Sequence, residues 1–567
     1  MRKVADDDKF IIANHNSEQA ADPSPCPNPR GWYHSVAGIK DTPDGLVATY
    51  RLSDSHTAVF THVMCAHSQD GGRTWSGHRS LTHRNVWEHH ACWVAPQLSR
   101  LSDGRLVVVV DEGHRTSGRD WAPLTEWQQR PPRGMANYLL WSDDNGRTWS
   151  QPEQIDDVGG EPGYIEELAD GALVYTRTET VPTDQIEDPP AKWGPNYYAN
   201  RLMASTDGGK TWAPRAMLSE APYHSDAEVG LVEVEPGQLW AATRIGFAGG
   251  KLGQPSRLFR SSDGGHTWDK GSLMPIYGQR TVVRKLASGR LLVTYRNRWG
   301  THASCVFVWD PSEELSYEPT SFIWDADRCV LEDGVMVTRT APGREQEVEF
   351  TLYPALTSAA EVDLEVELRR QPGDGQVVLS AGFGVAIVND SVRLAQYADT
   401  DDFDAGPLED VHPWTGATGA TTTQASLDTS EWHTYRLERR PSGCRLLVDG
   451  KQLLASDDPS LKQRYVRFGA GGELEAHWRA GSARVHNPQD YSIDWSWESA
   501  KGFPDQFQRD RVVVLDYTSD SGYSDWTQLQ DGTIVVADYS SDDFRNINSG
   551  GPQPVLKAYR LQEEDLL

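Results

Sequence analysis

The chain is short of positive charge, of cysteine and of long apolar runs. Its 567 residues carry a formal net charge of −28. Nucleic acids and anionic membrane surfaces attract positively charged proteins, so this balance argues against both as partners. It does not argue against an anionic small molecule, because a few converging arginines reverse the potential within one cleft.

Six cysteines are scattered without a CxxC pair, which indicates isolated thiols and not a disulfide framework. Met1 to Asn16 contains no apolar run of signal-peptide length, and no stretch approaches the length of a transmembrane helix. We therefore expect a cytoplasmic protein, or one whose signal peptide has been removed. The length predicts at least two domains. The sequence implies no cofactor and leaves the oligomeric state open.

A short motif, Ser-x-Asp-x-Gly-x-Thr-Trp, occurs four times. The copies begin at Ser68, Ser142, Ser205 and Ser261. The residue types suit a tight hairpin, because the Asp accepts hydrogen bonds from turn amides, the Gly allows positive φ and the Trp anchors the turn in a core. Four copies predict a repeated β-hairpin unit.

A second repeat interleaves with the first and consists of a turn glycine followed by a short apolar, β-branched run. Such a pattern is a hairpin signal, and no long stretch with a helical period competes with it. Six copies predict an all-β fold, a six-bladed β-propeller. The turn glycines are Gly45, Gly104, Gly171, Gly237, Gly289 and Gly532.

The sixth repeat lies far from the fifth, and the pattern between them changes. Residues 433–454 and 472–487 contain alternating strand pairs that resemble a lectin-like or laminin-G-like β-sandwich. We predict blades one to five in 1–340, an inserted sandwich in 341–487, and blade six with the closure of the ring in 488–567. Whether the sandwich binds carbohydrate or acts as a spacer stays open.

In a propeller, the innermost strand of each blade starts near the central axis. Equal distances from the turn glycine place side chains on the same face, because strand side chains alternate. A count of nine residues back from the glycine therefore predicts which side chains share one cavity. The count gives Glu228, Arg280 and Tyr523 in blades four, five and six, Ala95 and Pro162 in blades two and three, and His34 or Ser35 in blade one, which has extra residues.

The four motifs, together with GYSDWTQLQDGTI (522–534) and DAEVGLVEVEPGQLWAATR (226–244), resemble the sialidase (neuraminidase) superfamily, whose turn motif is the Asp-box or BNR repeat. The resemblance covers most of the chain outside the insertion. It implies that Tyr523 is the nucleophile, Glu228 the carboxylate that activates it and Asp54 the general acid. It also implies an arginine clamp for a substrate carboxylate, with Arg244, Arg280, Arg296 and Arg298 as candidates.

The chemistry implied by the resemblance is coherent. A phenol has a pKa of about 10, so a neighbouring carboxylate must take its proton before it can attack. A neutral nucleophile also avoids repulsion at an anionic sugar, and sialidases are glycosidases that use tyrosine in this way. The sequence departs from the family in blade one, where Tyr33-His34-Ser35-Val36 replaces an Arg-Ile-Pro-like segment and removes one clamp arginine.

We expect an exo-acting, retaining glycoside hydrolase that removes a terminal, acidic sugar from a glycan. The histidines His34, His90 and His224 stand near the starts of inner strands and are further candidates for binding the substrate. They also support an alternative, a polysaccharide lyase that cleaves at a uronic acid by His/Tyr β-elimination. A third hypothesis is a non-catalytic glycan-binding propeller. No metal site is predicted, because metal ligation needs three ligands that converge on one point, which a sequence does not show.

Overall fold

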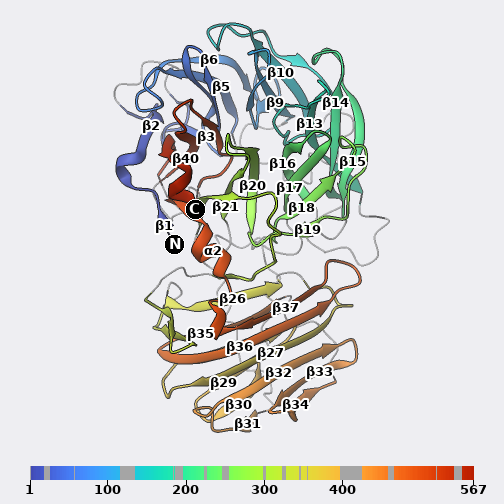
Figure 1. Cartoon of the computed structure of the whole chain (residues 1–567), viewed down its shortest axis with the longest axis vertical. Coiled ribbons are helices and arrows are strands. Elements are labelled where there is room, and N and C mark those ends of the chain that lie inside the picture. The colour runs from blue at the N-terminus through green and yellow to red at the C-terminus, as the bar shows by residue number, and fades with distance from the viewer. Residues whose placement is uncertain are drawn as a thin grey trace.

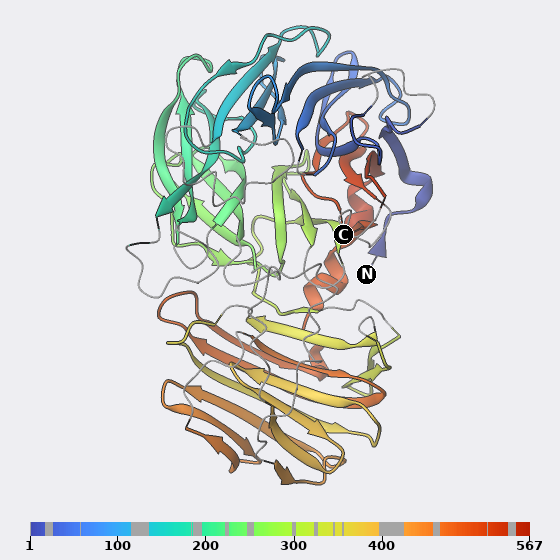
Figure 2. The same ribbon diagram turned by 180° about the vertical axis from the view of Figure 1, so that it is seen from behind.

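The protein is described by a computed structural model. The described residues are 2–17, 26–56, 58–114, 135–182, 184, 196–221, 226–245, 255–297, 302–321, 327–343, 346–353, 356–395, 424–457, 465–518, 520–541 and 552–567. Eight sheets contain most of them. Six of these sheets form the blades of a β-propeller, and the other two lie together beside it (Figure 1 and, from behind, Figure 2).

Blades one to four each contain strands that follow one another in the sequence, with antiparallel neighbours. Blade one contains β3 (Tyr33–Thr42), β4 (Gly45–Ser53), β5 (Phe60–Ser68) and β6 (Ser76–Asn85), and blade two contains β7 (Ala91–Trp93), β8 (Gln97–Arg100), β9 (Leu106–His114), β10 (Met135–Ser142) and β11 (Glu153–Gln154). Blade three contains β12 (Glu166–Glu167), β13 (Leu173–Pro182), β14 (Asn196–Ser205) and β15 (Ala213–Glu220). Blade four contains β16 (Asp226–Glu235), β17 (Gln238–Ile245), β18 (Arg257–Ser261) and β19 (Ser272–Leu273).

Blades five and six take strands from distant parts of the chain. Blade five contains β20 (Gly278–Lys285), β21 (Leu291–Asn297), β22 (Ala303–Trp309), β38 (Val513–Tyr517) and β1 (Arg2–Lys3), and blade six contains β39 (Asp525–Gln528), β40 (Ile534–Ser540), β41 (Val555–Leu561) and β2 (Lys9–Ala13). The N-terminal segment therefore adds the outer strand to both blades and closes the ring. The six-bladed propeller predicted from the repeats is confirmed.

The four repeated motifs build the same turn. In the first, the Ser68 hydroxyl donates to Asp70 and accepts from the Gly72 amide, while the Asp70 carboxylate accepts from the amide and hydroxyl of Thr74. The Trp75 indole donates to the Gly72 carbonyl at 3.0 Å. The same contacts recur in the motifs that begin at residues 142, 205 and 261. The motif thus supplies its own hydrogen bonds, which explains why it recurs unchanged.

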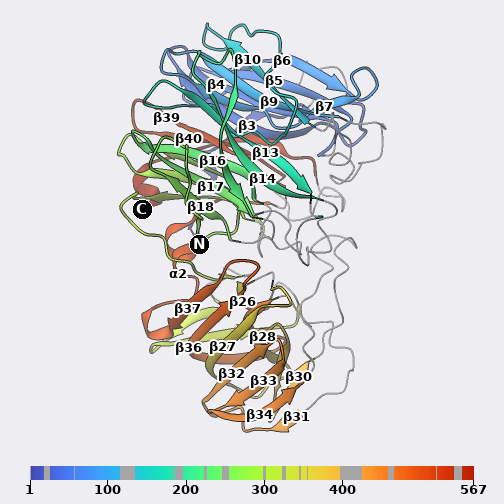
Figure 3. The ribbon, with the colours of Figure 1, turned by 90° about the vertical axis from the view of Figure 1, so that its right-hand side faces the viewer.

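Two further sheets enclose a second hydrophobic core that includes Phe350, Phe468 and Trp478. The first sheet contains, in spatial order, β23 (Thr320–Ser321), β26 (Val348–Tyr353), β35 (Val466–Gly471), β28 (Gln376–Ala381), β29 (Gly384–Val388), β30 (Ser391–Ala395) and β31 (Gln424–Ser426). The second contains β24 (Cys329–Glu332), β25 (Val335–Thr340), β36 (Leu474–His486), β27 (Glu361–Arg370), β32 (His433–Arg440), β33 (Gly443–Val448) and β34 (Lys451–Ser456), with β37 (Ile493–Glu498) paired to β36. Together they form a β-sandwich below the propeller (Figure 3).

The insertion differs in place from the prediction. We predicted it between blades five and six, in 341–487, whereas the chain leaves blade five after β22 and returns to the same blade as β38. Strands β23, β24, β25 and β37, which lie outside 341–487, pair with sandwich strands and not with the propeller. The short helix α2 (Gln506–Arg511) leads back to the ring. Local strand patterns could not reveal this, because they do not show which sheet edge a strand joins.

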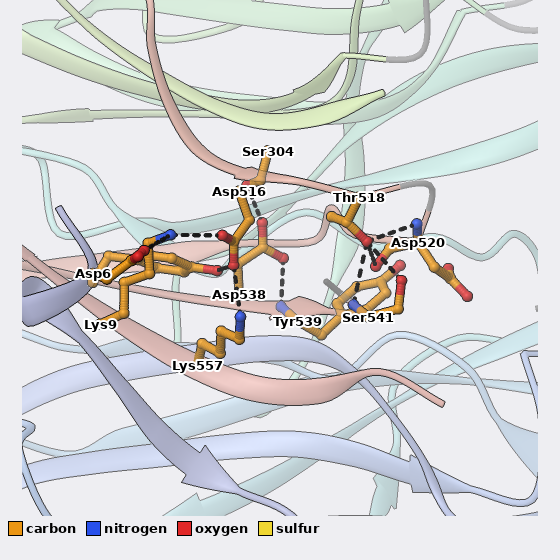
Figure 4. Close-up of polar contacts among 11 residues, drawn as sticks. Asp6, Lys9, Ser304, Asp516, Thr518, Asp520, Asp538, Tyr539, Ser541 and Lys557 are labelled. Carbon is orange, nitrogen blue, oxygen red and sulfur yellow. Dashed lines mark hydrogen bonds and ion pairs between the residues drawn. The ribbon is translucent and has the colours of Figure 1, made fainter. Parts of the chain in front are cut away.

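A buried charge network holds the closure of the ring. The carboxylate of Asp516, on β38 of blade five, accepts hydrogen bonds from Lys9 and Lys557 at 2.9 Å each and from the Tyr559 hydroxyl at 2.7 Å (Figure 4). Lys9 and Lys557 lie on β2 and β41 of blade six, so one carboxylate joins the two blades and the N-terminal segment. Burial favours the neutral form of Asp516, but the Lys557 charge and these hydrogen bonds outweigh it and lower its pKa.

Within the described ranges, every helix is too short or too polar to span a membrane.

The Asp516→Asn variant should unfold more easily, by about 3–5 kcal/mol, because it leaves two lysines beside a neutral amide in a buried place. Urea unfolding followed by tryptophan fluorescence measures this change. The control is Asp6→Asn, since Asp6 is exposed and pairs with the same Lys9, and it should leave the unfolding midpoint almost unchanged. Equal effects of the two substitutions would contradict the role given to Asp516.

Candidate functional site

Every blade has one non-glycine residue in the left-handed backbone conformation within or before the start of its innermost strand. Of the ten non-glycine residues with positive φ in the described chain, four are Asn or Asp residues that favour this region. The other six fall one to a blade, within or just before its innermost strand: Val36, His90, Glu161, Glu228, Arg280 and Tyr523. In β3, β16 and β20 the pairing register shifts at this residue, as a β-bulge does, so the bulge turns its side chain.

Glu228 and Tyr523 meet from two different blades. The Tyr523 hydroxyl donates a hydrogen bond to Glu228 Oε1, and Arg244 Nη1 lies 2.6 Å from the same oxygen. The backbone amide of Arg280 donates to Glu228 Oε2 at 3.2 Å, and the Arg280 guanidinium lies 5.0 Å from the centre of the Tyr523 ring. Both oxygens of Glu228, which is fully buried, are therefore occupied. The structure brings together the Glu, Arg and Tyr that the nine-residue count predicted.

The electrostatic surroundings set different protonation states for the two partners. Burial works to raise the pKa of Glu228, but the charges of Arg244 and Arg280 and the hydrogen bond from Tyr523 outweigh it, and the pKa is lowered. Burial, then the Glu228 and Glu161 charges, raise the pKa of Tyr523 well above its ordinary value. At neutral pH the pair is therefore a carboxylate that accepts from a neutral phenol, ready to receive its proton.

Two carboxylates of β16, Asp226 and Glu228, lie near Arg244 in the sequence pattern and are its candidate ion-pair partners. Asp226 binds Arg257 and accepts a hydrogen bond from the Thr243 hydroxyl at 2.8 Å. Arg244 pairs with Glu228, since Arg244 lies opposite Ala227 on the neighbouring strand β17.

A carboxyl group that the sequence count missed joins the site. Glu161 takes the left-handed position of blade three, where the count gave Pro162, because this blade has one more residue before its turn glycine. The Glu161 amide donates to Asp111 at 2.9 Å. Burial and the nearby Glu228 charge raise the pKa of Glu161 to about 7. The acidic residue in EPGY at a strand start was the only sequence signal for it.

Three arginines occupy equivalent positions on the second strands of three blades. Arg244 and Arg296 lie opposite the residue that precedes Glu228 and Arg280, respectively. In blade one, Arg51 lies opposite Ser35, which precedes Val36. Arg51 was not among the predicted site residues, because its position becomes equivalent only once the bulge at Val36 is known.

Arg51 is buried and held at the mouth between blades one and two. Its guanidinium donates to the carbonyls of Val94 and His56 at 3.2 and 2.8 Å. It also lies 6.0 Å from the centre of the Tyr33 ring. Arg51 therefore places a buried positive charge on the second strand of blade one.

Arg296 packs against the segment that carries Tyr523. A side chain at Gly522 would lie 2.6 Å from Arg296 Cβ, so these two residues are in close contact. The Gly522 amide donates to Asp538 at 3.1 Å, and Asp538 also accepts from Ser304 and from the Tyr539 amide (Figure 4). Burial raises the pKa of Asp538 to about 6.

Asp54 lies in the loop between β4 and β5. Its Oδ1 accepts hydrogen bonds from the amides of Val59 and Phe60 at 2.9 and 3.1 Å, which fixes the loop. The residue is 9% exposed, and burial raises the pKa of its carboxyl. Oδ1 therefore holds the loop through its hydrogen bonds, while burial favours the protonated form of the Asp54 carboxyl.

Of the predicted histidines, the two that the structure describes, His34 and His90, do not gather at the site. His34 is buried beside His15 and bonds to the Pro554 carbonyl at 2.9 Å, and burial lowers its pKa to about 3. Val36, not His34 or Ser35, takes the blade-one position, and in blade two the left-handed residue is His90, not Ala95. The His90 side chain is exposed. His224 and Arg298 lie outside the described residues.

No group of three or more His, Cys, Asp or Glu residues is arranged to hold a metal ion in the part of the chain that the structure describes.

A second charged network crosses the axis farther along the inner strands. Asp525 accepts from Lys40 and, at 2.7 Å, from Arg284, whose Nε lies 3.5 Å from Glu166 of blade three. At this level, the Arg284–Glu166 pair and the hydrogen bond from Tyr164 to the Ser524 carbonyl at 3.0 Å join non-adjacent blades. Side chains of four blades therefore fill the axis beyond Tyr523.

No family model matches the chain. A sialidase of Clostridium perfringens is 23% identical over 248 residues, which are 42% of this chain and 60% of that protein. A sialidase of Paraclostridium sordellii is 22% identical over 259 residues, 42% of this chain and 57% of that protein. The matched segments thus span less than two thirds of either relative. Among solved structures, Trypanosoma rangeli sialidase matches 84% of this chain and 93% of its own, with 13% identity and a TM-score of 0.37.

The sequence similarity to sialidases and the six-bladed ring together define the class: the chain is a sialidase-like β-propeller.

The backbone beside Tyr523 leaves no room for a side chain. Gly522 and Gly532 both have positive φ, but a Cβ at Gly522 would overlap Arg296 whereas one at Gly532 meets nothing within 4 Å. Each Gly→Ala substitution should lower the free energy of unfolding by about 1 kcal/mol, because alanine disfavours the left-handed backbone conformation. Gly522→Ala should destabilise by about 1–3 kcal/mol more, from overpacking. Urea unfolding of the two variants measures the difference, and equal losses would refute the close packing.

Proposed function

We propose that the protein is an exo-acting, retaining glycoside hydrolase that removes a terminal, acidic sugar from a glycan. The hydrogen bond between the Tyr523 hydroxyl and the Glu228 carboxylate carries this proposal. A buried carboxylate that accepts from a neutral phenol is the arrangement that a tyrosine nucleophile requires. The similarity to sialidases supports the same chemistry.

In the first step, Tyr523 Oη attacks the anomeric carbon while its proton passes to Glu228. The bond from that carbon to the leaving oxygen breaks, and Asp54 gives the leaving oxygen a proton. In the second step, water attacks the anomeric carbon and gives a proton to Asp54, while the Tyr523 oxygen leaves and recovers its proton from Glu228. Two displacements at one carbon retain its configuration.

The surroundings of Asp54 suit a group that must begin as an acid. Burial raises its pKa, so a larger fraction of the carboxyl is protonated at a given pH. Its ordered loop fixes the direction from which it meets the leaving group.

An arginine set supports an acidic sugar. Arg51, Arg244 and Arg296 take equivalent positions in blades one, four and five, and Arg280 lies over the Tyr523 ring. Guanidinium groups bind carboxylates through paired hydrogen bonds, which a lysine does not provide. We assign the substrate carboxylate to this set, with Arg51 in place of the arginine that is missing from the first strand of blade one.

Exo action is supported by the network that fills the axis beyond the site. With Arg284, Glu166 and Tyr164 linking opposite sides of the ring, a polysaccharide cannot thread along the axis. A sugar at the end of a glycan can reach Tyr523 from the other side.

The test is a screen of aryl glycosides of sialic acids, related nonulosonic acids, uronic acids and rhamnose, with variants of the pair. Tyr523→Phe should lower kcat/KM by about a thousandfold or more, because the nucleophile is gone. Glu228→Gln should lower it by about a hundredfold or more, because the phenol keeps its proton. Tyr138→Phe, which removes a phenol hydroxyl weakly bonded to Glu112, is the matched control and should retain activity. Full activity of Tyr523→Phe on the identified sugar would refute the mechanism.

Arg51 gives a separate test of the sugar class. Arg51→Met should raise KM for an acidic aryl glycoside by about tenfold to a hundredfold, the value of a lost charged hydrogen bond, with a smaller change in kcat. Arg51→Lys should recover only part of this loss, because lysine keeps the charge but not the fork. A neutral analogue of the same sugar should show no such change. Equal losses on the acidic and neutral substrates would assign Arg51 a purely structural role.

A lyase that cleaves at a uronic acid is the second candidate. The observation that favours it is a Tyr–His pair, because the Tyr33 hydroxyl lies 2.8 Å from Nδ1 of His56, and the His56 side chain is exposed. β-Elimination at a uronic acid needs such a base and acid. A product that absorbs in the ultraviolet, formed without aryl release, would favour the lyase. Glycan binding without any product would favour a non-catalytic propeller.

A further inference from the structure

Glu161 differs from the other two carboxyl groups beside it in its hydrogen bonds. Asp111 accepts from the amides of Ala95 and Glu161 at 2.7 and 2.9 Å, one on each oxygen. Glu228 is occupied on both oxygens, as described above. Glu161 Oε2, by contrast, is a buried atom without a hydrogen-bond partner in the described part of the chain. Such an atom is costly unless a ligand or water completes it, so Glu161 has capacity for a new partner.

The groups that interact electrostatically with Glu161 come from four other blades. They are the carboxyls of Asp111 on β9 and Glu228 on β16, the guanidiniums of Arg244 on β17 and Arg280 on β20, and the Tyr523 phenol before β39. When Glu161 is neutral, the two arginines balance the Asp111 and Glu228 carboxyls. When Glu161 is ionised, the same two arginines face three carboxyls, which leaves an excess of negative charge. Burial, followed by the Glu228 charge, raises the pKa of Glu161 to about 7, so its charge changes near neutral pH.

We propose that Glu161 is a further substrate-binding residue, whose neutral carboxyl donates a hydrogen bond to the acidic sugar and whose ionised form repels that sugar. This inference rests on the proposed function, because it needs an anion beside Tyr523. It gives the site a dependence on pH that the Tyr523–Glu228 pair does not itself supply. Neither the nucleophile nor its base changes charge between pH 6 and 8 in this arrangement, because one pKa is lowered and the other is raised.

The direction of the pH dependence follows from the sign of the shift. Below pH of about 7 Glu161 holds its proton and the acidic sugar binds. Above it, the carboxylate forms, and kcat/KM for the acidic sugar falls by up to about tenfold per pH unit, as for a single essential proton. The decrease should appear in KM more than in kcat, since the repelled group is the substrate.

The experiment compares the wild type with Glu161→Gln, which keeps the size and a hydrogen-bond donor but cannot ionise. Profiles of kcat/KM from pH 5 to 9 are measured with the acidic aryl glycoside identified by the screen. We expect the wild type to lose activity above pH 7 through a rising KM, and Glu161→Gln to keep a flat KM to at least pH 8. The matched control is Glu166→Gln in the same blade, whose side chain is also partly buried but lies in the network with Arg284. It should keep the alkaline decrease.

A second readout does not depend on turnover. A carboxyl with a raised pKa in the folded state contributes stability that is present below its unfolded pKa of about 4.5 and is lost as pH rises through 7. The melting temperature of the wild type should therefore fall more from pH 5 to 8 than that of Glu161→Gln. A parallel fall in both proteins would show that Glu161 does not exchange its proton in this range.

The possible failures are distinguishable. An unchanged alkaline decrease in active Glu161→Gln overturns the role of Glu161 and leaves the proposed function intact. A complete loss of activity in Glu161→Gln at pH 6, with a normal melting temperature, would place Glu161 in the chemical step and also overturns the proposal. If the wild type hydrolyses no glycoside at all, the proposed function fails, and this inference fails with it.

Discussion

A left-handed residue within or before the innermost strand of each blade is the constraint on which the site depends. Each such residue costs about 1–3 kcal/mol outside glycine, and Val36 is β-branched, the least suited type. The strain occurs in all six blades, and in blades four, five and six it falls on residues that meet at the site. Glu228, Arg280 and Tyr523 meet because the left-handed backbone conformation occurs at the same level of the axis in three separate blades.

The ring in turn depends on two polar connections. The Asp516 carboxylate joins the last two blades to the N-terminal segment, and the network around Asp525 links blades across the axis. Both are buried, where a satisfied ion pair is specific in its geometry but expensive to break. The Asp516 carboxylate connects outer strands of blades five and six, whereas the Asp525 network links residues at the inner strands of four blades. The chain leaves blade five after β22 for the sandwich and returns to the same blade as β38. None of the described sandwich strands joins a propeller blade.

Much of this arrangement could be predicted from the sequence, because the hairpin turns recur with glycines at fixed offsets. That offset found Glu228, Arg280 and Tyr523, since their blades share one spacing. It failed for Glu161 because blade three has an extra residue before its turn glycine. In blade one the strict count of nine from Gly45 gives Val36, and the allowance for extra residues, which led to His34 or Ser35, was wrong. Arg51 could not be found, because its equivalence to Arg244 and Arg296 depends on strand register. The place of the insertion was wrong because β38 returns to a sheet edge that no local pattern specifies.

The central claim is that Tyr523 forms a covalent bond to the sugar. The most direct test is mass spectrometry of the intact protein and of its peptides after incubation with 2,3-difluorosialic acid, or with the corresponding fluorinated analogue if a screen identifies another acidic sugar. The account predicts one adduct per chain, located on the peptide that contains Tyr523 and absent in Tyr523→Phe. An adduct on a different residue, or none under conditions in which the protein hydrolyses the parent glycoside, would contradict it.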